Sequence, residues 1–388
     1  MRASLVGVSL VLLLVGLAPA NDSLNVRLVG SCSASGWVNE MALAGNHAYV
    51  SAHEAGLRIV DISDPTHPTQ IGSYTGYIIV DVAVRGDHAY VAAFAQGLRV
   101  VSIVDPTHPV EVGALEIHGH TWDVALQGDY AYVADFDSGL VVISVADPAN
   151  PTEVGHCHTS SYAHGVAVSG DFAYVPVYGQ GLRVFSVSDP ANPTEVGYFQ
   201  TEQAWDVAVV GTLAYLAAPD DTLWIISVAD PTNPVGVGYC RLTVPSPLCV
   251  AVDGSLAYLA AKDGGLRVVS VADSTNPVEI GYYVTPYPAY GVAASGEYIY
   301  LGDAAGGLQV LELYESGVEE SRKPQASSRK PTATILSGAS GVRSLAASVV
   351  FDAMGRRVLN PRSGVYFVRQ ASSVMRGASS VTKVMIQR

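Results

Sequence analysis

The chain has 388 residues, of which 49% are hydrophobic and 14% are charged, and its formal net charge is −14. This length allows one large domain with an appendage. An acidic protein repels phosphate backbones, so the charge excludes nucleic acid as the expected partner. The positive mean hydropathy, +0.28, is explained by strands that are buried on both faces, without a membrane.

Residues 1–20 have the pattern of a secretory signal peptide. Arg2 precedes an apolar run over residues 5–17, and Ala18-Pro19-Ala20 supplies the small residues of a cleavage site. The apolar run is too short to span a bilayer as a stable anchor. We therefore expect cleavage before Asn21, export by a Sec-type route, and no transmembrane segment in the mature chain.

A sevenfold internal repeat occupies most of the remaining chain. One glycine recurs at intervals of 41 to 43 residues, at Gly45, Gly86, Gly128, Gly170, Gly211, Gly254 and Gly296. In the repeat at residues 122–155, three β-rich runs are separated by glycine turns, and an Asp-Pro-x-x-Pro turn leads to a fourth run. Four short antiparallel strands in a period near 42 residues predict one blade of a β-propeller.

The two ends of the repeat region predict how the ring closes. The last repeat stops at residues 311–314 without a fourth strand, whereas a fourth-strand marker, Val29-Gly30, precedes the first complete repeat. We therefore expect the N-terminal strand to complete the last blade, which joins the ends and removes an open sheet edge. The predicted fold is all-β, with a seven-bladed propeller over residues 21–314.

The C-terminal region differs in composition from the ring. Residues 315–345 are rich in Ser, Lys, Arg, Gly and Pro, which is typical of a linker. Residues 346–388 contain three β runs separated by glycine turns, which predict a small β-sandwich-like module. Residues 316–388 hold 12 Lys and Arg against 3 Asp and Glu, so this basic tail is a separate unit from the acidic ring.

The repeat resembles the LVIVD repeat of secreted and surface propellers from bacteria and archaea. The Gly-Asp…Ala-Tyr-Val core, the Gly-Leu-Arg-Val strands at residues 97–100 and 181–184, and the Asp-Pro-x-x-Pro turns carry this resemblance over residues 24–314. It implies a propeller located outside the cytoplasm, and it does not imply one particular activity.

The C-terminal run resembles the sorting tail of type IX secretion substrates. Three motifs carry the resemblance: Asp352…Gly355-Arg356…Val358, then Gly364-Val365-Tyr366-Phe367, and the closing Lys383-Val384. The resemblance implies passage across an outer membrane, followed by release or attachment at the cell surface. The alternative is a small β domain without a sorting role.

Candidate binding residues are expected on one face of the ring. In a propeller the loops between second and third strands share a face with the connections between blades, and variable residues there determine binding. Aromatic rings stack on sugars or anchor protein partners, and carboxylates accept hydrogen bonds. The candidates are Trp122, Asp135, Asp137, Tyr162, Tyr178, Trp205, Asp221 and Tyr290. Of these, Trp122, Trp205 and Tyr290 share one slot near the mouth of the channel, where packing between blades is the alternative role.

Two groups of residues raise the question of a bound cation. His118, His120 and His164 lie near Asp135 and Asp137 on neighbouring blades, and His with Asp can bind Zn²⁺. Glu40, Asp81, Asp123 and Asp206 share one first-strand slot, and a ring of carboxylates suits Ca²⁺. The favoured alternatives are solvated loop residues in the first group and acceptors of backbone hydrogen bonds in the second. The favoured interpretation thus needs no cofactor.

No catalytic motif of the G-x-S-x-G, H-E-x-x-H or P-loop kind is present in the sequence. The favoured function is therefore a non-catalytic module that binds a surface protein or a glycan outside the cell. A metal-dependent hydrolase or lyase and a structural surface-layer component are the alternatives. Of the four cysteines, only Cys240 and Cys249 flank one connection, and unpaired thiols are the favoured interpretation for all four.

Overall fold

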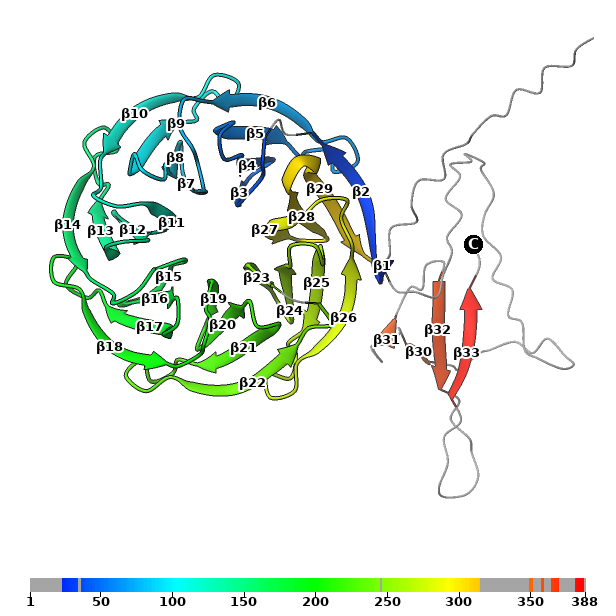
Figure 1. Ribbon diagram of the computed structural model, residues 1–388. Helices are drawn as coiled ribbons and strands as arrows, with labels where there is room; N and C mark the ends of the chain where they lie inside the picture. The colour runs from blue at the N-terminus through cyan, green and yellow to red at the C-terminus, as the bar shows by residue number, and fades with distance from the viewer. Residues whose placement is uncertain are drawn as a thin grey trace, which may run out of the picture. The chain divides into compact units, whose positions relative to one another are not determined.

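The computed structural model describes residues 23–33, 36–244 and 246–314, together with four short strands between residues 349 and 386. The first three ranges form a ring of seven antiparallel sheets around a central channel (Figure 1). This architecture confirms the predicted seven-bladed propeller. The predicted signal peptide, residues 1–20, and the predicted linker, residues 315–345, lie outside the described residues.

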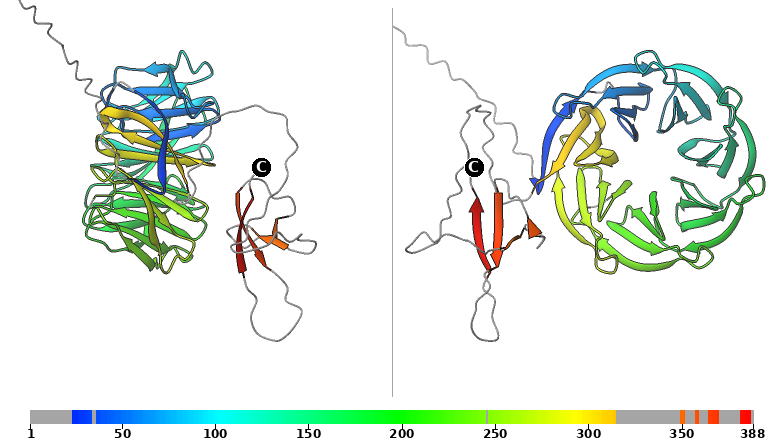
Figure 2. Two further views of the ribbon diagram at one scale, coloured as in Figure 1. Left: turned by 90° about the vertical axis from the view of Figure 1, so that its right-hand side faces the viewer. Right: turned by 180° about the vertical axis from the view of Figure 1, so that it is seen from behind.

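Each blade is a meander whose first strand lies innermost and whose last strand lies outermost, in both views along the ring axis (Figures 1 and 2). Blade 1 contains β3 (Met41–Ala44), β4 (His47–Ser51), β5 (Leu57–Asp61) and β6 (Thr69–Tyr74). Blade 2 contains β7 (Asp81–Arg85), β8 (His88–Ala92), β9 (Leu98–Ser102) and β10 (Val110–Leu115). Blade 3 contains β11 (Thr121–Gln127), β12 (Tyr130–Asp135), β13 (Gly139–Ser144) and β14 (Thr152–Cys157).

The following blades repeat this order. Blade 4 contains β15 (Ala167–Ser169), β16 (Phe172–Val177), β17 (Gly181–Ser186) and β18 (Thr194–Phe199). Blade 5 contains β19 (Asp206–Val210), β20 (Leu213–Ala218), β21 (Thr222–Ser227) and β22 (Val235–Arg241). Blade 6 contains β23 (Cys249–Asp253), β24 (Leu256–Ala260), β25 (Leu266–Ser270) and β26 (Val278–Tyr283), and β1 (Ser23–Leu24) pairs with its outer edge.

Blade 7 is built from both ends of the ring region, as predicted. It contains β27 (Ala289–Ser295), β28 (Tyr298–Asp303), the short 3₁₀ helix η1 (Ala304–Gly306), β29 (Gly307–Leu313) and the N-terminal β2 (Val26–Cys32). β2 pairs antiparallel with β29, from Val26 opposite Leu313 to Cys32 opposite Leu308. This pairing gives the blade its outermost strand and closes the ring without an open edge between its ends.

The C-terminal strands form a unit of their own. The strands β30 (Val349–Phe351), β31 (Arg357–Val358), β32 (Gly364–Arg369) and β33 (Val381–Ile386) make one antiparallel sheet in the order β31-β30-β32-β33. The residues between these strands lie outside the described residues, so the sandwich-like module and its sorting role stay predictions.

The local chemistry of the repeat explains the blades. The glycine of the first hairpin has a positive φ in every blade, near 56° at Gly128, which is the conformation that a tight hairpin turn requires. The second and third strands are buried on both faces, because each sheet is covered by the next. Phe185 and Val175 of blade 4, for example, pack in one cluster with Tyr132 and Val142 of blade 3. This packing accounts for the high hydrophobic content.

A close backbone contact joins neighbouring blades along the outer rim. Gly113 of β10 lies so near the Pro148 carbonyl oxygen in the turn of blade 3 that a Cβ atom would fall within 3.0 Å of it. The same contact recurs at Gly30, Gly72, Gly155, Gly197 and Gly238, each against the turn of the following blade. A β-bulge lies at the residue before each of these glycines and bends the strand there. Only glycine leaves room for this approach.

The turn on the other side of this contact is rigid. In each of six blades the turn aspartate accepts a hydrogen bond from the backbone N–H two residues later, as Asp147 does from Ala149 at 3.0 Å. Asp273 keeps this bond although its turn lacks the first proline of the pattern. These hydrogen bonds hold the carbonyl group that faces the glycine.

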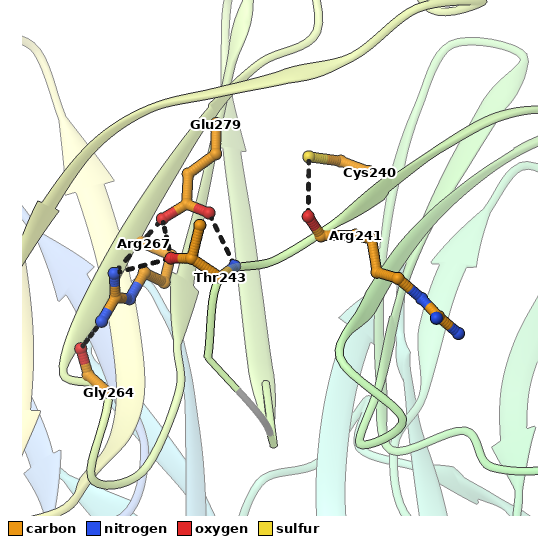
Figure 3. Close-up of polar contacts among 6 residues, drawn as sticks. All are labelled: Cys240, Arg241, Thr243, Gly264, Arg267 and Glu279. Atoms are coloured by element: carbon orange, nitrogen blue, oxygen red, sulfur yellow. Dashed lines mark hydrogen bonds and ion pairs between the residues drawn. The ribbon is translucent and has the colours of Figure 1, made fainter.

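The connection between blades 5 and 6 departs from the repeat and has its own clamp (Figure 3). Glu279 of β26 accepts hydrogen bonds from the Thr243 backbone N–H at 2.9 Å and from Arg267 Nη1 at 3.2 Å. Arg267 also donates to the Gly264 carbonyl oxygen at 2.9 Å. Its guanidinium carbon lies 4.8 Å from the centre of the Tyr282 ring, which adds a cation–π contact.

The rim contact predicts different costs for two glycines of β22. Gly238→Ala places a Cβ against the Ser274 carbonyl oxygen, so we expect a loss of about 1–3 kcal/mol in the free energy of unfolding. Gly236→Ala is the matched control, because its Cβ meets only the end of the Phe199 ring, and we expect a change within about 0.5 kcal/mol. Denaturant titration of both variants measures this difference. Equal losses would contradict the proposed role of the rim contact.

The clamp predicts that removing two arginines at equivalent positions of the repeat costs different amounts of stability. The Arg267 side chain is 4% exposed and its partner Glu279 is 12% exposed, whereas Arg183 and its partner Glu195 are 15% and 39% exposed. Arg267→Ala leaves a buried carboxylate short of a partner and should cost about 2–3 kcal/mol. Arg183→Ala should cost about 1 kcal/mol or less. Thermal unfolding of the two variants compares these costs, and a larger loss in Arg183→Ala would refute the ranking.

Candidate functional site

The loops between second and third strands and the connections between blades lie on one face, as expected. Single β-bridges join them, between His53 and Ile79, Phe94 and Thr121, Ala163 and Val177, and Lys262 and Ala289. Three of the bridges tie a loop of one blade to the segment that leads into the next blade, and the Ala163–Val177 bridge ties the connection into blade 4 to the end of that blade's own β16. The mouth of the channel on this face is therefore framed by segments from adjacent blades.

A cavity of about 650 Å³ occupies this end of the channel. The innermost strands line it with three tiers of side chains at consecutive positions. The first tier, at the mouth, contains Asn39, Val80, Trp122, His164, Trp205, Leu248 and Tyr290. The second contains Glu40, Asp81, Asp123, Asp206 and Cys249, and the third contains Val82, Val124, Val166, Val250 and Val292. The predicted shared slot of Trp122, Trp205 and Tyr290 is thus part of the first tier.

The second tier links the blades. Asp81 Oδ2 accepts a hydrogen bond from the Val124 N–H of the next blade at 2.9 Å. Asp123 makes the same bond with Val166 at 2.6 Å, and Asp206 makes it with Val250 at 2.7 Å. Three of the four carboxylates therefore have the structural role that was favoured from the sequence, as acceptors of backbone hydrogen bonds.

The remaining positions of the second tier break the pattern. Cys249 takes the aspartate's place in blade 6, where its Sγ accepts from the Val292 N–H at 3.3 Å. Its thiol lies 3.3 Å from Glu40 Oε2 and donates to it across blade 7. Gly291 of blade 7 carries no side chain, because a Cβ there would collide with the Asn39 carbonyl oxygen. Glu40 therefore faces a thiol instead of a backbone N–H.

Burial and mutual repulsion perturb the second-tier carboxylates. Burial raises the pKa of Asp206 to about 6 and also raises the pKa of Asp81. The pKa values of Glu40 and Asp123 lie well above the ordinary range, first because of burial and then because of the neighbouring carboxylates. Asp206 and Asp81 both raise the pKa of Glu40, and a hydrogen bond between Asp81 and Asp123 lowers the pKa of Asp81 and raises that of Asp123.

Aromatic side chains surround half of the mouth in an arc over blades 2 to 5. We call this set, Phe94, His120, Trp122, Phe136, Tyr162, His164, Tyr178 and Trp205, the aromatic arc. Phe136 stacks on Tyr162 and His164 stacks on Trp205, each with ring centroids 4.0 Å apart. Trp122 lies between them, 5.6 Å from Phe136 and 5.9 Å from His164. On the opposite side, Trp37 packs on Tyr290 at 5.5 Å.

His164 is the most enclosed member of the aromatic arc. It is 5% exposed, its Nδ1 has no hydrogen-bond partner, and burial lowers its pKa to about 4. The imidazole is therefore neutral at physiological pH. It lines the cavity and is not part of the loop surface that was expected from the sequence.

The residues of the predicted zinc site have separate surroundings. His120 Nδ1 lies 2.6 Å from Asp137 Oδ2, an exposed pair. His118 contributes its backbone carbonyl oxygen, which accepts a hydrogen bond from Ser138. Asp135 is fully buried and accepts the N–H groups of Asp137 and Ser138, so it shapes the loop. Within the described part of the chain, no three His, Cys, Asp or Glu side chains form a group that could hold a metal ion.

The other predicted residues lie around the mouth at different depths. Tyr162 and Tyr178 are 46% and 45% exposed, and Tyr290 lines the cavity wall. Asp221 has a positive φ of 75°, and its backbone carbonyl oxygen accepts the Leu242 N–H at 2.7 Å, so it supports the connection between blades 5 and 6.

Sequence reasoning missed Trp37, Phe94 and Phe136. Phe94 and Phe136 occupy the same loop position as Tyr178, one residue after the second strand's last buried position, and that shared slot was the available signal. The sequence prediction considered the polar residues of these loops and therefore did not include Phe94 and Phe136.

All four cysteines are free, and Cys240 is not bonded to Cys249. Among the residues that were described, no helix has the length and apolar character needed to cross a membrane.

Comparison with known proteins identifies the repeat. A family model described as the LVIVD repeat matches seven consecutive segments, residues 35–76, 79–116, 118–159, 160–201, 203–241, 249–285 and 288–312. Among solved structures, the crystal structure of the computationally designed Ika8 protein is similar, with a TM-score of 0.57 and 9% identity. The match covers 74% of this chain and 100% of that one, and at this identity it supports the fold alone. No curated protein matches the chain significantly.

The second tier predicts that the free energy of unfolding depends on pH, and that Asp206→Asn removes part of this dependence. The folded state binds a proton on Asp206 more tightly than the unfolded state, whose ordinary pKa is 3.8. Protonation therefore adds stability that is present below about pH 4 and is lost as the pH rises through about 6. Asp206→Asn cannot gain this proton. Wild type should gain about 1–2 kcal/mol relative to Asp206→Asn between pH 7.5 and pH 4.5, with solvent in the channel screening part of the effect.

The measurement is the free energy of unfolding of both proteins at the two pH values. Glu202→Gln, which changes an exposed carboxylate four residues earlier, is the control and should follow the wild type. A constant difference between wild type and Asp206→Asn would count against a raised pKa.

Proposed function

This chain belongs to the LVIVD repeat family, and we propose that it is a non-catalytic binding module whose ligand enters the channel mouth. The observation that carries this proposal is the aromatic arc around a cavity of about 650 Å³. Ligand sites in proteins are concave, mostly apolar and of this size, with a few polar groups that fix orientation. The three tiers supply this combination of surfaces.

The exposed rings favour a ligand that presents flat or apolar surfaces. Tyr162 and Tyr178 are nearly half exposed although each packs against another ring of the arc. Such preordered rings lose little conformational entropy when they stack on a sugar or on a protein side chain. A surface protein or a glycan is therefore the proposed partner.

The carboxylates support binding in preference to catalysis. Asp81, Asp123 and Asp206 each accept a backbone N–H of the next blade, so their positions serve the ring. General acid–base work needs groups that are free to exchange protons with a substrate. Among the described residues of the predicted zinc site, the exposed His120–Asp137 pair is the one contact that favours the metal-dependent hydrolase alternative.

We place this module outside the cytoplasm. The N-terminal pattern of a secretory signal and the C-terminal resemblance to a type IX sorting tail support this location. In this proposal the sorting tail delivers the ring to the cell surface, where the channel mouth meets its partner.

The test compares two tryptophans at different places in the ring. Trp122→Ala removes the central ring of the aromatic arc, whereas Trp224→Ala removes a ring from the outer strands of blade 5, where it packs on Phe199 and Tyr239. Wild type and both variants are applied to arrays of glycans and of peptides from surface proteins. For a ligand captured by wild type, we expect Trp122→Ala to bind at least about tenfold more weakly and Trp224→Ala to bind normally.

Circular dichroism and thermal unfolding of each variant confirm that the ring is intact. The opposite pattern, with binding lost only in Trp224→Ala, would move the site to the outer strands. Equal binding by all three proteins would refute the channel mouth as the site.

A further inference from the structure

We propose that the channel mouth binds an organic cation, a primary ammonium or guanidinium group, between the second-tier carboxylates and the aromatic arc. This inference rests on the proposed function, because it names the ligand chemistry of the same site. Four features of the cavity support it: its acidic side chains, its acceptors, its aromatic wall and its size.

The cavity wall carries four acidic side chains and one basic one. Glu40, Asp81, Asp123 and Asp206 line it, and Lys262 is the only lysine or arginine among its lining residues. In the described part of the chain, none of the ion pairs joins Lys262 to a carboxylate. The carboxylates are therefore not neutralised by the protein's own cation, and a ligand cation would relieve their repulsion.

Two side chains of this wall have acceptor capacity that the described backbone of the next blade does not use. Among the described second-tier carboxylates, Glu40 is the one that accepts no backbone N–H of the next blade; its donors are the weak Cys249 thiol and the N–H of its own neighbour Met41. His164 is nine-tenths buried, lines the cavity and has an unpartnered Nδ1. With its proton on Nε2, the neutral imidazole presents a lone pair at Nδ1 that accepts an N–H from an ammonium or guanidinium group.

The aromatic wall favours the same charge. The faces of tryptophan and tyrosine rings attract cations, and the attraction is greatest where water is excluded. Trp122 and Trp205 of the first tier immediately precede Asp123 and Asp206 of the second along the chain, and all four line the cavity. A cation held by the carboxylates would therefore lie near these aromatic rings.

The size and donor set of the cavity favour an organic cation over a metal ion. A cavity of about 650 Å³ is far larger than a coordination sphere, and no described group of three His, Cys, Asp or Glu converges as metal ligands do. An amine or guanidinium group with its carbon framework fills such a space and uses the aromatic rings as well.

The experiment uses two matched pairs of probes on the full chain, with binding followed by titration calorimetry. Glucosamine is compared with N-acetylglucosamine, and Nα-acetyl-lysine methylamide is compared with its Nε-acetylated form. Within each pair acetylation removes the positive charge, leaves one N–H donor and adds an acetyl group. We expect the charged member of at least one pair to bind about tenfold more tightly than its neutral partner. The pair that responds tells a sugar amine from a lysine side chain as the source of the cation.

Glu40→Gln is the diagnostic variant, because it keeps the shape of the side chain and touches no backbone bond between blades. The substitution should weaken binding of the charged probe about fivefold to tenfold and leave binding of the neutral probe unchanged. Glu202→Gln, at an exposed position outside the cavity, is the control and should bind both probes as wild type does.

The outcomes separate this inference from the proposed function. If the neutral probes bind as tightly as the charged ones, and Trp122→Ala no longer binds them, the result supports the channel mouth as the binding site. The same result overturns the inference that the ligand is a cation. Failure of all four probes to bind at millimolar concentration would also overturn the cation inference, while the array experiment still decides the proposed function on neutral ligands.

Discussion

The contact between a fourth-strand glycine and the turn of the next blade determines the geometry of the whole ring. At this contact a backbone carbonyl oxygen occupies the space that any side chain would need. The turn that presents the carbonyl is held by its own aspartate, and a β-bulge bends the strand that carries the glycine. Since the contact recurs from blade to blade, it sets the angle between sheets and hence the width of the channel. The candidate site at the centre thus depends on packing at the outer rim.

The inner ring is regular where the fold needs it and irregular where a ligand is expected. Aspartates at one slot bind the next blade's backbone in blades 2, 3 and 5. Glycine at Gly165 and Gly291 lets neighbouring strands approach closely, and Cys249 substitutes a thiol in blade 6. Glu40 of blade 1 and His164 of blade 4 are further departures in other parts of the ring, a carboxylate that accepts the Cys249 thiol and an imidazole whose Nδ1 has no partner. Loss of sevenfold symmetry therefore gives the cavity wall different chemistry at different blades.

The sequence predicted most of the scaffold, because its signals are local. Hairpin glycines, the Asp-Pro turns and alternating strands each act within a few residues, and the surplus marker at Val29-Gly30 predicted the closure correctly. The structural role of Asp81, Asp123 and Asp206 also followed from their shared slot. The surroundings of His164 did not, because its stacking partner Trp205 lies one blade away and only the closed ring brings the two rings together. For the same reason His118 and His120, on the connection before blade 3, have partners unlike those of His164.

The strand that completes blade 7 has a consequence for the timing of folding. β2 and β29 meet although the residues that pair are separated by about the full length of the ring, as Arg27 and Glu312 are, 285 positions apart. Such a pairing forms last, since the entropy lost on closing so long a loop is recovered only when every intervening sheet is in place. When only six blades have been synthesised, the ring is still open, because β29 is not yet available to pair with β2. The closed ring is therefore reached only when the chain has supplied β29, and until then the N-terminal strand β2 has no partner in blade 7.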